Sequence, residues 1–295
     1  MSERKLYLGA LTDNRRWDMI NIRADDVIVV TPPKCGTTWM QTIVALLFSG
    51  DPDVETELSV NMPWVDIRIR EMPEIADRLE QMTRRRSMKS HTPLDGLPID
   101  DKAHYICVFR HPLDAHFSFR KHVRNVPLPW FDVWYPQDDT DGTTFRRFLD
   151  GGAEGFDTDL MPLAHIIRHY KAATALAHRS NVTLVHYADL TRDLAGNFAQ
   201  LAAALNVSHP ALVMEQLVQA ATFDHMKANA ERYAPAGGKG FMKSDSDFFH
   251  SGSSGKWEGE LTNAELAAYD DLMDEYLSPQ ERSWLEFGTA HKVHT

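Results

Sequence analysis

Short apolar runs alternate along this chain with longer stretches of helical periodicity. Unbroken apolar runs are typical of strands buried on both faces of a parallel sheet, and they stand at residues 27–30 and 105–109, with a third strand candidate at 182–187. A shorter strand ending in a Pro-containing loop is predicted near residue 88. Apolar residues recur at helical spacing in the ranges 38–48, 74–83, 161–177, 193–205 and 261–287. The alternation predicts an α/β fold with a central parallel sheet.

The first apolar run leads through residues 31–36 into a helix that is apolar nearly all round. Two prolines end the strand, because neither can donate to a ladder, and Gly36 permits a turn that a Cβ would obstruct. The helix start presents unpaired N–H groups and a positive dipole end. Lys34 adds a charge, while Thr37 and Thr38 add hydroxyls. The stretch therefore predicts an anion-binding loop. It is not a Walker A loop, in which the Lys follows the last Gly.

The second long apolar run leads into a further anion-binding candidate. Arg110 follows the run directly, and Pro112 suits the first turn of a helix that would carry Asp114 and Ser118. The planar fork of an arginine binds phosphate oxygens in bidentate fashion. Alone, a strand that ends in Arg and leads to a Pro-initiated helix is weak evidence for a phosphate site.

Composition limits the classes of function that are open to the chain. It has 295 residues with 43% hydrophobic and 25% charged content, which is ordinary for a globular protein. We expect one domain over residues 1–295. The formal net charge of −11 argues against binding to nucleic acid or anionic membranes. Two cysteines form no disulfide framework, and neither an apolar signal segment nor a membrane-spanning run is present. These features favour a cytoplasmic location.

Residues 33–39 resemble the 5′-phosphosulfate loop of the cytosolic-type sulfotransferase family, although Cys35 stands where the family usually has a small residue such as Ser. The family moves a sulfuryl group from 3′-phosphoadenosine 5′-phosphosulfate (PAPS) to a hydroxyl or amine and releases 3′-phosphoadenosine 5′-phosphate (PAP). The resemblance implies a three-layer α/β/α sandwich of the P-loop-NTPase-like sulfotransferase type. It also implies that the donor is held by Lys34, Cys35, Gly36, Thr37, Thr38 and Trp39.

The resemblance also implies the catalytic residues. Viewed alone, His91 is one of 14 histidines, but Lys89, His91 and Leu94 match the family's Lys-Thr-His-Leu-Pro-Leu type segment. His91 would then act as general base. Lys34 would stabilise charge on the leaving oxygen, and Lys89 would neutralise charge on the transferring group. No metal is required in this scheme.

Further donor contacts follow from the same resemblance. Arg110, Asp114 and Ser118 match the 3′-phosphate segment, in which the Arg and Ser grip the phosphate. Tyr187, Thr222 and Phe223 fall at adenine-side positions. The family's closing Arg-Lys-Gly-x-x-Gly-x-Trp motif corresponds to a segment that begins Phe249, His250, Ser251 and Gly252. His250 and Ser251 replace two cations, which leaves open whether the donor binds tightly and whether Lys256 substitutes for them in part.

Alternatives remain open at this point. A nucleotide kinase or NTPase-like phosphoryl transferase would need a Lys after the last Gly, and a non-catalytic nucleotide-binding relative would fit the degraded closing motif. Residues 125–160 are predicted to be a loop whose aromatics either line an acceptor pocket or pack the loop down. Residues 84–86 are predicted to be a solvated basic face, and His165 and His169 an ordinary helix face. The sequence predicts no particular oligomer. A small apolar alcohol, phenol or lipid acceptor is suggested by Trp64, Trp130, Trp134 and Phe241.

Overall fold

The computed structural model describes residues 4–54, 57–126, 134–136, 139, 142–151, 157–233, 252 and 254–289. Within them, four parallel strands form one sheet in the order β2-β1-β3-β4. The strands are β1 (Val27–Val30), β2 (Ser87–Ser90), β3 (His104–Phe109) and β4 (Val182–His186). The predicted parallel sheet is confirmed, including the short strand near residue 88.

Alternate residues of the strands enter two separate hydrophobic cores, one on each face of the sheet. Val27 and Val29 pack into one core, and Ile28 and Val30 pack into the other. This is the consequence of the two-residue period of a strand. Both faces are therefore covered by helices, which explains why β1 carries no polar position. The three-layer α/β/α arrangement is confirmed.

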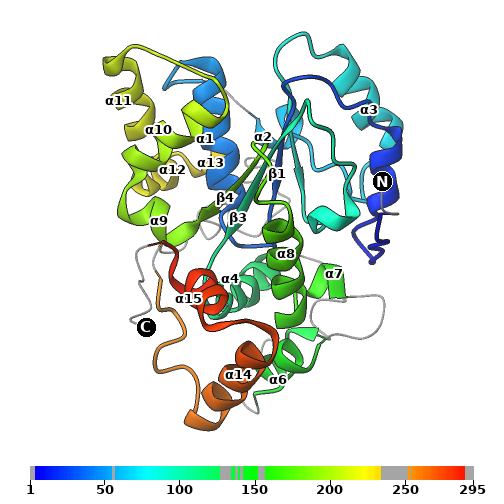
Figure 1. The fold of residues 1–295 in the computed structure, drawn as a ribbon, viewed down its shortest axis with the longest axis vertical. Coiled ribbons are helices and arrows are strands. Elements are labelled where there is room, and N and C mark those ends of the chain that lie inside the picture. Colours follow the sequence, from blue (N-terminus) through cyan, green and yellow to red (C-terminus); the bar gives the residue numbers. More distant parts are fainter. Residues whose placement is uncertain are drawn as a thin grey trace.

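The helices fall into two groups around the sheet (Figure 1). One group comprises α1 (Thr37–Ser49), α2 (Leu58–Asn61), α9 (Tyr187–Arg192), α10 (Leu194–Ala204), α11 (Ala211–Ala220), α12 (Phe223–Ala228) and α13 (Ala230–Tyr233). The other comprises η1 (Asn14–Met19), α3 (Met72–Gln81), η2 (Leu94–Gly96), α4 (Pro112–Asn125), α6 (Thr143–Asp150), α7 (Asp157–Leu160), α8 (Leu163–Ala175), α14 (Asn263–Tyr276) and α15 (Pro279–Phe287). No helix of the described residues is long and apolar enough to cross a membrane.

One sequence prediction needs correction at the level of helices. The prediction of a loop over residues 125–160 is wrong where α6 lies, because Phe145 and Phe148 are spaced for one helix face and are both buried in the core. The helical range predicted over residues 261–287 is confirmed, as the two helices α14 and α15. It breaks at Leu277, and Ser278 starts α15 with a capping box, in which its hydroxyl accepts from the backbone of Glu281.

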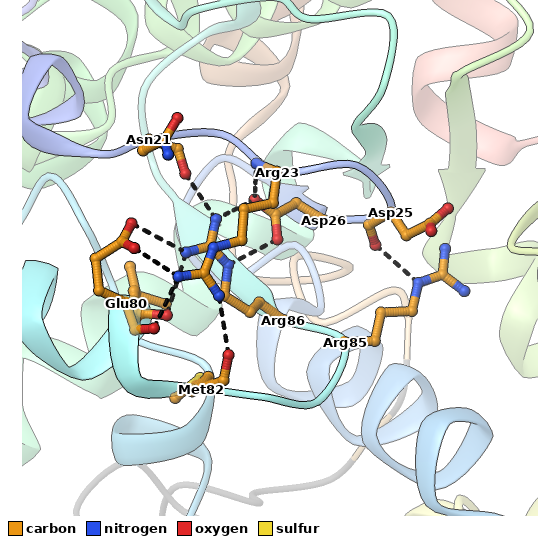
Figure 2. Close-up of polar contacts among 9 residues, drawn as sticks. Asn21, Arg23, Asp25, Asp26, Glu80, Met82, Arg85 and Arg86 are labelled. Atoms are coloured by element: carbon orange, nitrogen blue, oxygen red, sulfur yellow. Dashed lines mark hydrogen bonds and ion pairs between the residues drawn. The ribbon is translucent and has the colours of Figure 1, made fainter.

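The prediction of a solvated basic face at residues 84–86 is wrong for Arg86. Its side chain is 1% exposed and forms an ion pair with Asp26, whose side chain is 2% exposed. Arg86 Nε donates to Asp26 Oδ1 at 2.8 Å, and its Nη2 donates to the carbonyl of Asn21 at 2.7 Å (Figure 2). These residues directly precede β1 and β2, so the pair joins the amino ends of the two strands. Arg85 lies over the ring of Phe48, with 4.7 Å from its guanidinium carbon to the ring centroid.

Candidate active site

The loop between β1 and α1 has the strand-turn-helix geometry that the sequence predicts. Lys34 and Gly36 both adopt positive φ angles, of 65° and 108°. A Cβ at Gly36 would lie 3.1 Å from the ring of Tyr187, so glycine is needed both for the turn and for this contact. Gly36 caps α1 without a side-chain hydrogen bond. The hydroxyls of Thr31 and Thr37 lie 2.5 Å apart at the base of the loop.

His91 stands at the carboxyl end of β2, beside the same loop. Its Nδ1 lies 2.7 Å from the carbonyl oxygen of Thr31. Because a carbonyl only accepts, Nδ1 carries the proton and the neutral ring keeps a lone pair on Nε2. Burial, followed by the charges of Lys89 and Lys34, lowers the pKa of His91 to about 3. The imidazole is thus a neutral acceptor throughout the neutral pH range.

Four cations lie around the same loop. They are Lys34 after β1, Lys89 in β2, Arg110 after β3, and Lys256 of a C-terminal segment. Burial, then the charges of Arg110, Lys256 and Lys89, lowers the pKa of Lys34 to about 7. The pKa of Lys89 falls to about 8 chiefly through burial. Burial and the charge of Arg110 lower the pKa of Lys256 to about 8. Like charges held together in this way favour an anionic ligand, which would relieve their repulsion.

The predicted 3′-phosphate segment is built on the end of β3 and on α4. Arg110 is 4% exposed, and its guanidinium carbon lies 4.3 Å from the ring centroid of Tyr187. Ser118 lies two turns along α4. Asp114 accepts from the backbone N–H groups of Gly255 at 3.1 Å and Lys256 at 2.9 Å. Asp114 therefore ties the closing segment to α4 and brings Lys256 to the cationic cluster.

The predicted adenine-side residues also meet. The rings of Trp39 and Tyr187 are edge to face with centroids 5.1 Å apart, and Trp39 Nε1 donates to the carbonyl of Ala221 at 2.8 Å. The hydroxyl of Tyr187 donates to the carbonyl of Gly252 at 3.1 Å, and the Phe223 ring lies 2.7 Å from the position of a Cβ at Gly252. Thr222 caps α12, where its hydroxyl accepts from the backbone of His225. Phe249, His250 and Ser251 lie outside the described residues.

The sequence analysis missed two buried groups that adjoin His91. Asp66 is fully buried, and its carboxylate accepts from the backbone of His91 at 3.2 Å. His169 Nε2 donates to the carbonyl oxygen of His91 at 3.0 Å. His165 and His169 are thus buried behind His91 rather than on an ordinary helix face. No cluster of three or more potential metal ligands occurs among the residues that the structure describes.

A third missed residue is His122 on α4. Its pKa lies well below its usual value because of burial and then the charges of Lys34 and Lys89 and the ring of His91. His122 is therefore a neighbour of the proposed catalytic groups. Helical spacing offered a signal, since Asp114, Ser118 and His122 recur every four residues on one face of α4.

Comparisons with known proteins agree with this site. Residues 24–280 match the sequence model of the family described as "Sulfotransferase domain". A glycolipid sulfotransferase of Mycobacterium bovis is 33% identical over 98% of this chain and 96% of its own length. Among solved structures, mouse sulfotransferase SULT7A1 complexed with PAP has a TM-score of 0.72 at 20% identity and covers 94% of each chain. Retinol dehydratase in complex with androsterone and PAP has a TM-score of 0.69 at 20% identity, covering 90% of this chain and 84% of its own.

The structural likeness, at this identity, shows a shared fold. The family match and the close relative go further, and they favour a sulfotransferase over the phosphoryl-transfer and non-catalytic alternatives. Matched over residues 24–280 by the family model and over nearly its whole length by a sulfotransferase, the chain belongs to the sulfotransferase family.

Proposed function

We propose that this sulfotransferase transfers the sulfuryl group of PAPS to the hydroxyl of an apolar, lipid-like acceptor, with His91 as the general base. The observation that carries the proposal is the neutral His91 ring, whose Nδ1–H is bonded to the carbonyl of Thr31 beside Lys34 and Lys89. The solved structures of similar fold contain PAP, the desulfonated form of this donor.

The donor is assigned to the loop after β1 and to the ends of β3 and α4. The 5′-phosphosulfate would lie on the N–H groups and hydroxyls of residues 34–38, where a helix N-terminus favours an anion. Arg110 and Ser118 would hold the 3′-phosphate, with Lys256 supplying charge where the family's Arg-Lys pair is replaced. The adenine would lie near the cluster of Trp39, Tyr187 and Phe223.

The transfer itself would be an in-line displacement at sulfur. The acceptor oxygen forms a bond to sulfur as the bond from sulfur to the 5′-phosphate oxygen breaks, and the acceptor proton passes to His91 Nε2. Lys34 would stabilise the charge that develops on the leaving oxygen, and Lys89 the charge on the sulfuryl oxygens. We assign charge neutralisation to these lysines rather than to a metal ion.

The low pKa of His91 in the free protein is compatible with this role. The pKa is lowered in part by Lys89 and Lys34, and a bound anionic donor would offset both charges. The pKa of His91 should therefore rise toward the working pH when the donor binds, which is where a general base is most effective.

A lipid-like acceptor is supported by the relatives and by Trp64. The relative from Mycobacterium bovis is a glycolipid sulfotransferase, and retinol dehydratase was solved with androsterone. Trp64 is half-buried, with its ring centroid 4.8 Å from that of His91 and 4.8 Å from Lys89 Nζ. An apolar wall beside the base would orient an alcohol whose body is apolar.

The decisive experiment compares His91→Ala with His178→Ala, a control at an exposed histidine. With PAPS and either androsterone or a glycolipid as acceptor, His91→Ala should lower kcat by about 10²- to 10⁴-fold. The affinity of His91→Ala for PAP, measured by calorimetry in EDTA, should stay near that of the wild type. His178→Ala should keep both the kcat and the PAP affinity of the wild type. Retained turnover in His91→Ala would refute the assignment of the base.

A further inference from the structure

We propose that Asp66 is a positioning residue of the reaction, whose carboxylate holds the backbone of His91 and sustains the protonated state of Lys89. The inference rests on the roles proposed above for His91 and Lys89. It adds a charged group that belongs to neither the donor loop nor the catalytic segment.

The chain segment around Trp64 places Asp66 under the base. This segment runs parallel to β2, with a bridge between Trp64 and Lys89. Lys89 N donates to the carbonyl of Pro63 at 2.9 Å, and Val65 N donates to the carbonyl of Lys89 at 3.2 Å. The Trp64 ring then contacts both Lys89 and His91, and two residues later, in a turn, Asp66 reaches the backbone of His91.

His91 is held at three atoms by three different parts of the fold. Its backbone N–H donates to Asp66 Oδ2 at 3.2 Å, and its carbonyl accepts from His169 Nε2 at 3.0 Å. Its ring Nδ1 donates to the carbonyl of Thr31 at 2.7 Å. Asp66 Oδ2 also accepts from the hydroxyl of Thr92 at 3.0 Å. Asp66 thus fixes the backbone turn at His91 and Thr92, and this turn orients the imidazole of His91.

Charge gives Asp66 a second effect. Burial raises the pKa of Asp66, while the hydrogen bond from the hydroxyl of Thr92 opposes that rise. Burial and the charge of Arg70 lower the pKa of Lys89, and the Asp66 charge raises it. The charged and titratable groups facing His91 are Lys89, Lys34, His165, His169 and His122. Removing the Asp66 charge should therefore allow Lys89 to lose its proton at lower pH.

A matched control is a second buried aspartate, which lies near Asp66 but holds the N-terminal segment instead of His91. Asp159 is 6% exposed and accepts from the backbone of Leu11 and the hydroxyl of Thr12, both at 2.8 Å. It has the same kinds of partner as Asp66, namely one backbone N–H and one threonine hydroxyl, and these partners belong to the N-terminal segment. Replacing either aspartate by asparagine preserves shape and removes a charge, so loss of folding stability alone would affect both variants.

The test measures kcat, KM for PAPS, and the pH dependence of kcat for Asp66→Asn and Asp159→Asn. Asp66→Asn should lower kcat about 10- to 100-fold, within the range that general-base catalysis contributes, with KM for PAPS nearly unchanged. The alkaline limb of its kcat profile should move down by about one pH unit. Asp159→Asn should keep the wild-type kcat and profile. An unaltered profile in folded Asp66→Asn would overturn the inference.

A second variant covers the case in which Asp66→Asn does not fold. Thr92→Val removes one hydrogen bond to Asp66 and keeps its charge, so kcat should fall about 2- to 10-fold, consistent with one hydrogen bond, while the alkaline limb stays in place. A Thr92→Val enzyme with wild-type kcat would count against the positioning role. The proposed function fails separately, by retained turnover in His91→Ala. An inactive His91→Ala with a normal Asp66→Asn would reject this inference alone.

Discussion

The two ends of the central sheet handle buried charge in opposite ways. At the amino ends of β1 and β2, Arg86 is sealed from solvent by an ion pair with Asp26 and by backbone carbonyls (Figure 2). At the carboxyl ends, burial and then nearby cations lower the pKa values of Lys34, Lys89 and Lys256 to about 7, 8 and 8.

The difference separates a group used for structure from groups used for binding. A buried charge is tolerated when hydrogen bonds and an opposite charge replace its hydration. The amino end meets that condition within the chain itself. The carboxyl end holds several cations, and an anionic ligand would relieve their mutual repulsion. We therefore expect these cations to contribute much of the free energy of donor binding.

The largest effect, on folding stability, should come from breaking the buried ion pair between Arg86 and Asp26. Arg86→Met leaves the Asp26 carboxylate buried without its partner, which costs about 3–5 kcal/mol of folding stability. Urea denaturation measures the loss. The double variant Asp26→Leu with Arg86→Met should recover much of it, because an apolar pair needs no compensation. A single variant as stable as the wild type would contradict the structural role of the pair.

At the opposite end, Lys34→Met should affect rate rather than stability. Loss of one stabiliser of developing charge lowers kcat by about 10²- to 10³-fold. The melting temperature at pH 7 should stay level or rise, since burial and neighbouring cations already lower the pKa of Lys34 to about 7. Single-turnover kinetics test the predicted loss of rate, and thermal melting tests the predicted stability. A strongly destabilised variant with normal kcat would reverse the comparison.

Arg110→Gln should weaken binding in a ligand-specific way. One charge-assisted hydrogen bond is worth about 1.5–3 kcal/mol, so affinity for PAP should fall about 10- to 150-fold. Affinity for adenosine 5′-phosphate, which lacks the 3′-phosphate, should change little. Calorimetry with both nucleotides checks the prediction. Equal losses for the two would show that Arg110 does not read the 3′-phosphate.

The smallest effect concerns pH. The folded-state pKa values of Lys34, Lys89 and Lys256, about 7, 8 and 8, lie below the value of about 10.4 for an unfolded lysine. Above pH 7 the unfolded chain therefore binds more protons, and the stability of the free protein should rise with pH. Bound PAP favours the charged lysines, so its gain in melting temperature should be larger at pH 7 than at pH 9. A gain independent of pH would disprove this linkage.

Local features were predicted well where one short stretch contains every part. The strand, the Gly36 turn and the helix start lie within residues 27–38, and backbone conformation there depends on neighbours in sequence. The degraded closing motif was harder to interpret. Asp114 binds the backbone N–H groups of Gly255 and Lys256, more than 140 residues away in sequence. This contact places the Lys256 charge beside the other cations, where the motif itself lacks its Arg-Lys pair.

The sequence by itself determined the type of strands, the anion-binding loop and the family, because each depends on residue order over a few turns of chain. The tertiary structure decided which distant groups meet. Asp66 and His169 reach His91 across 25 and 78 residues, and Arg86 meets Asp26 across 60. The physical reason is that burial and partner choice follow from the strand order β2-β1-β3-β4. The strand order decides which groups are buried and which groups lie beside them, and these two factors shift their pKa values. Residue spacing along the sequence does not specify either factor.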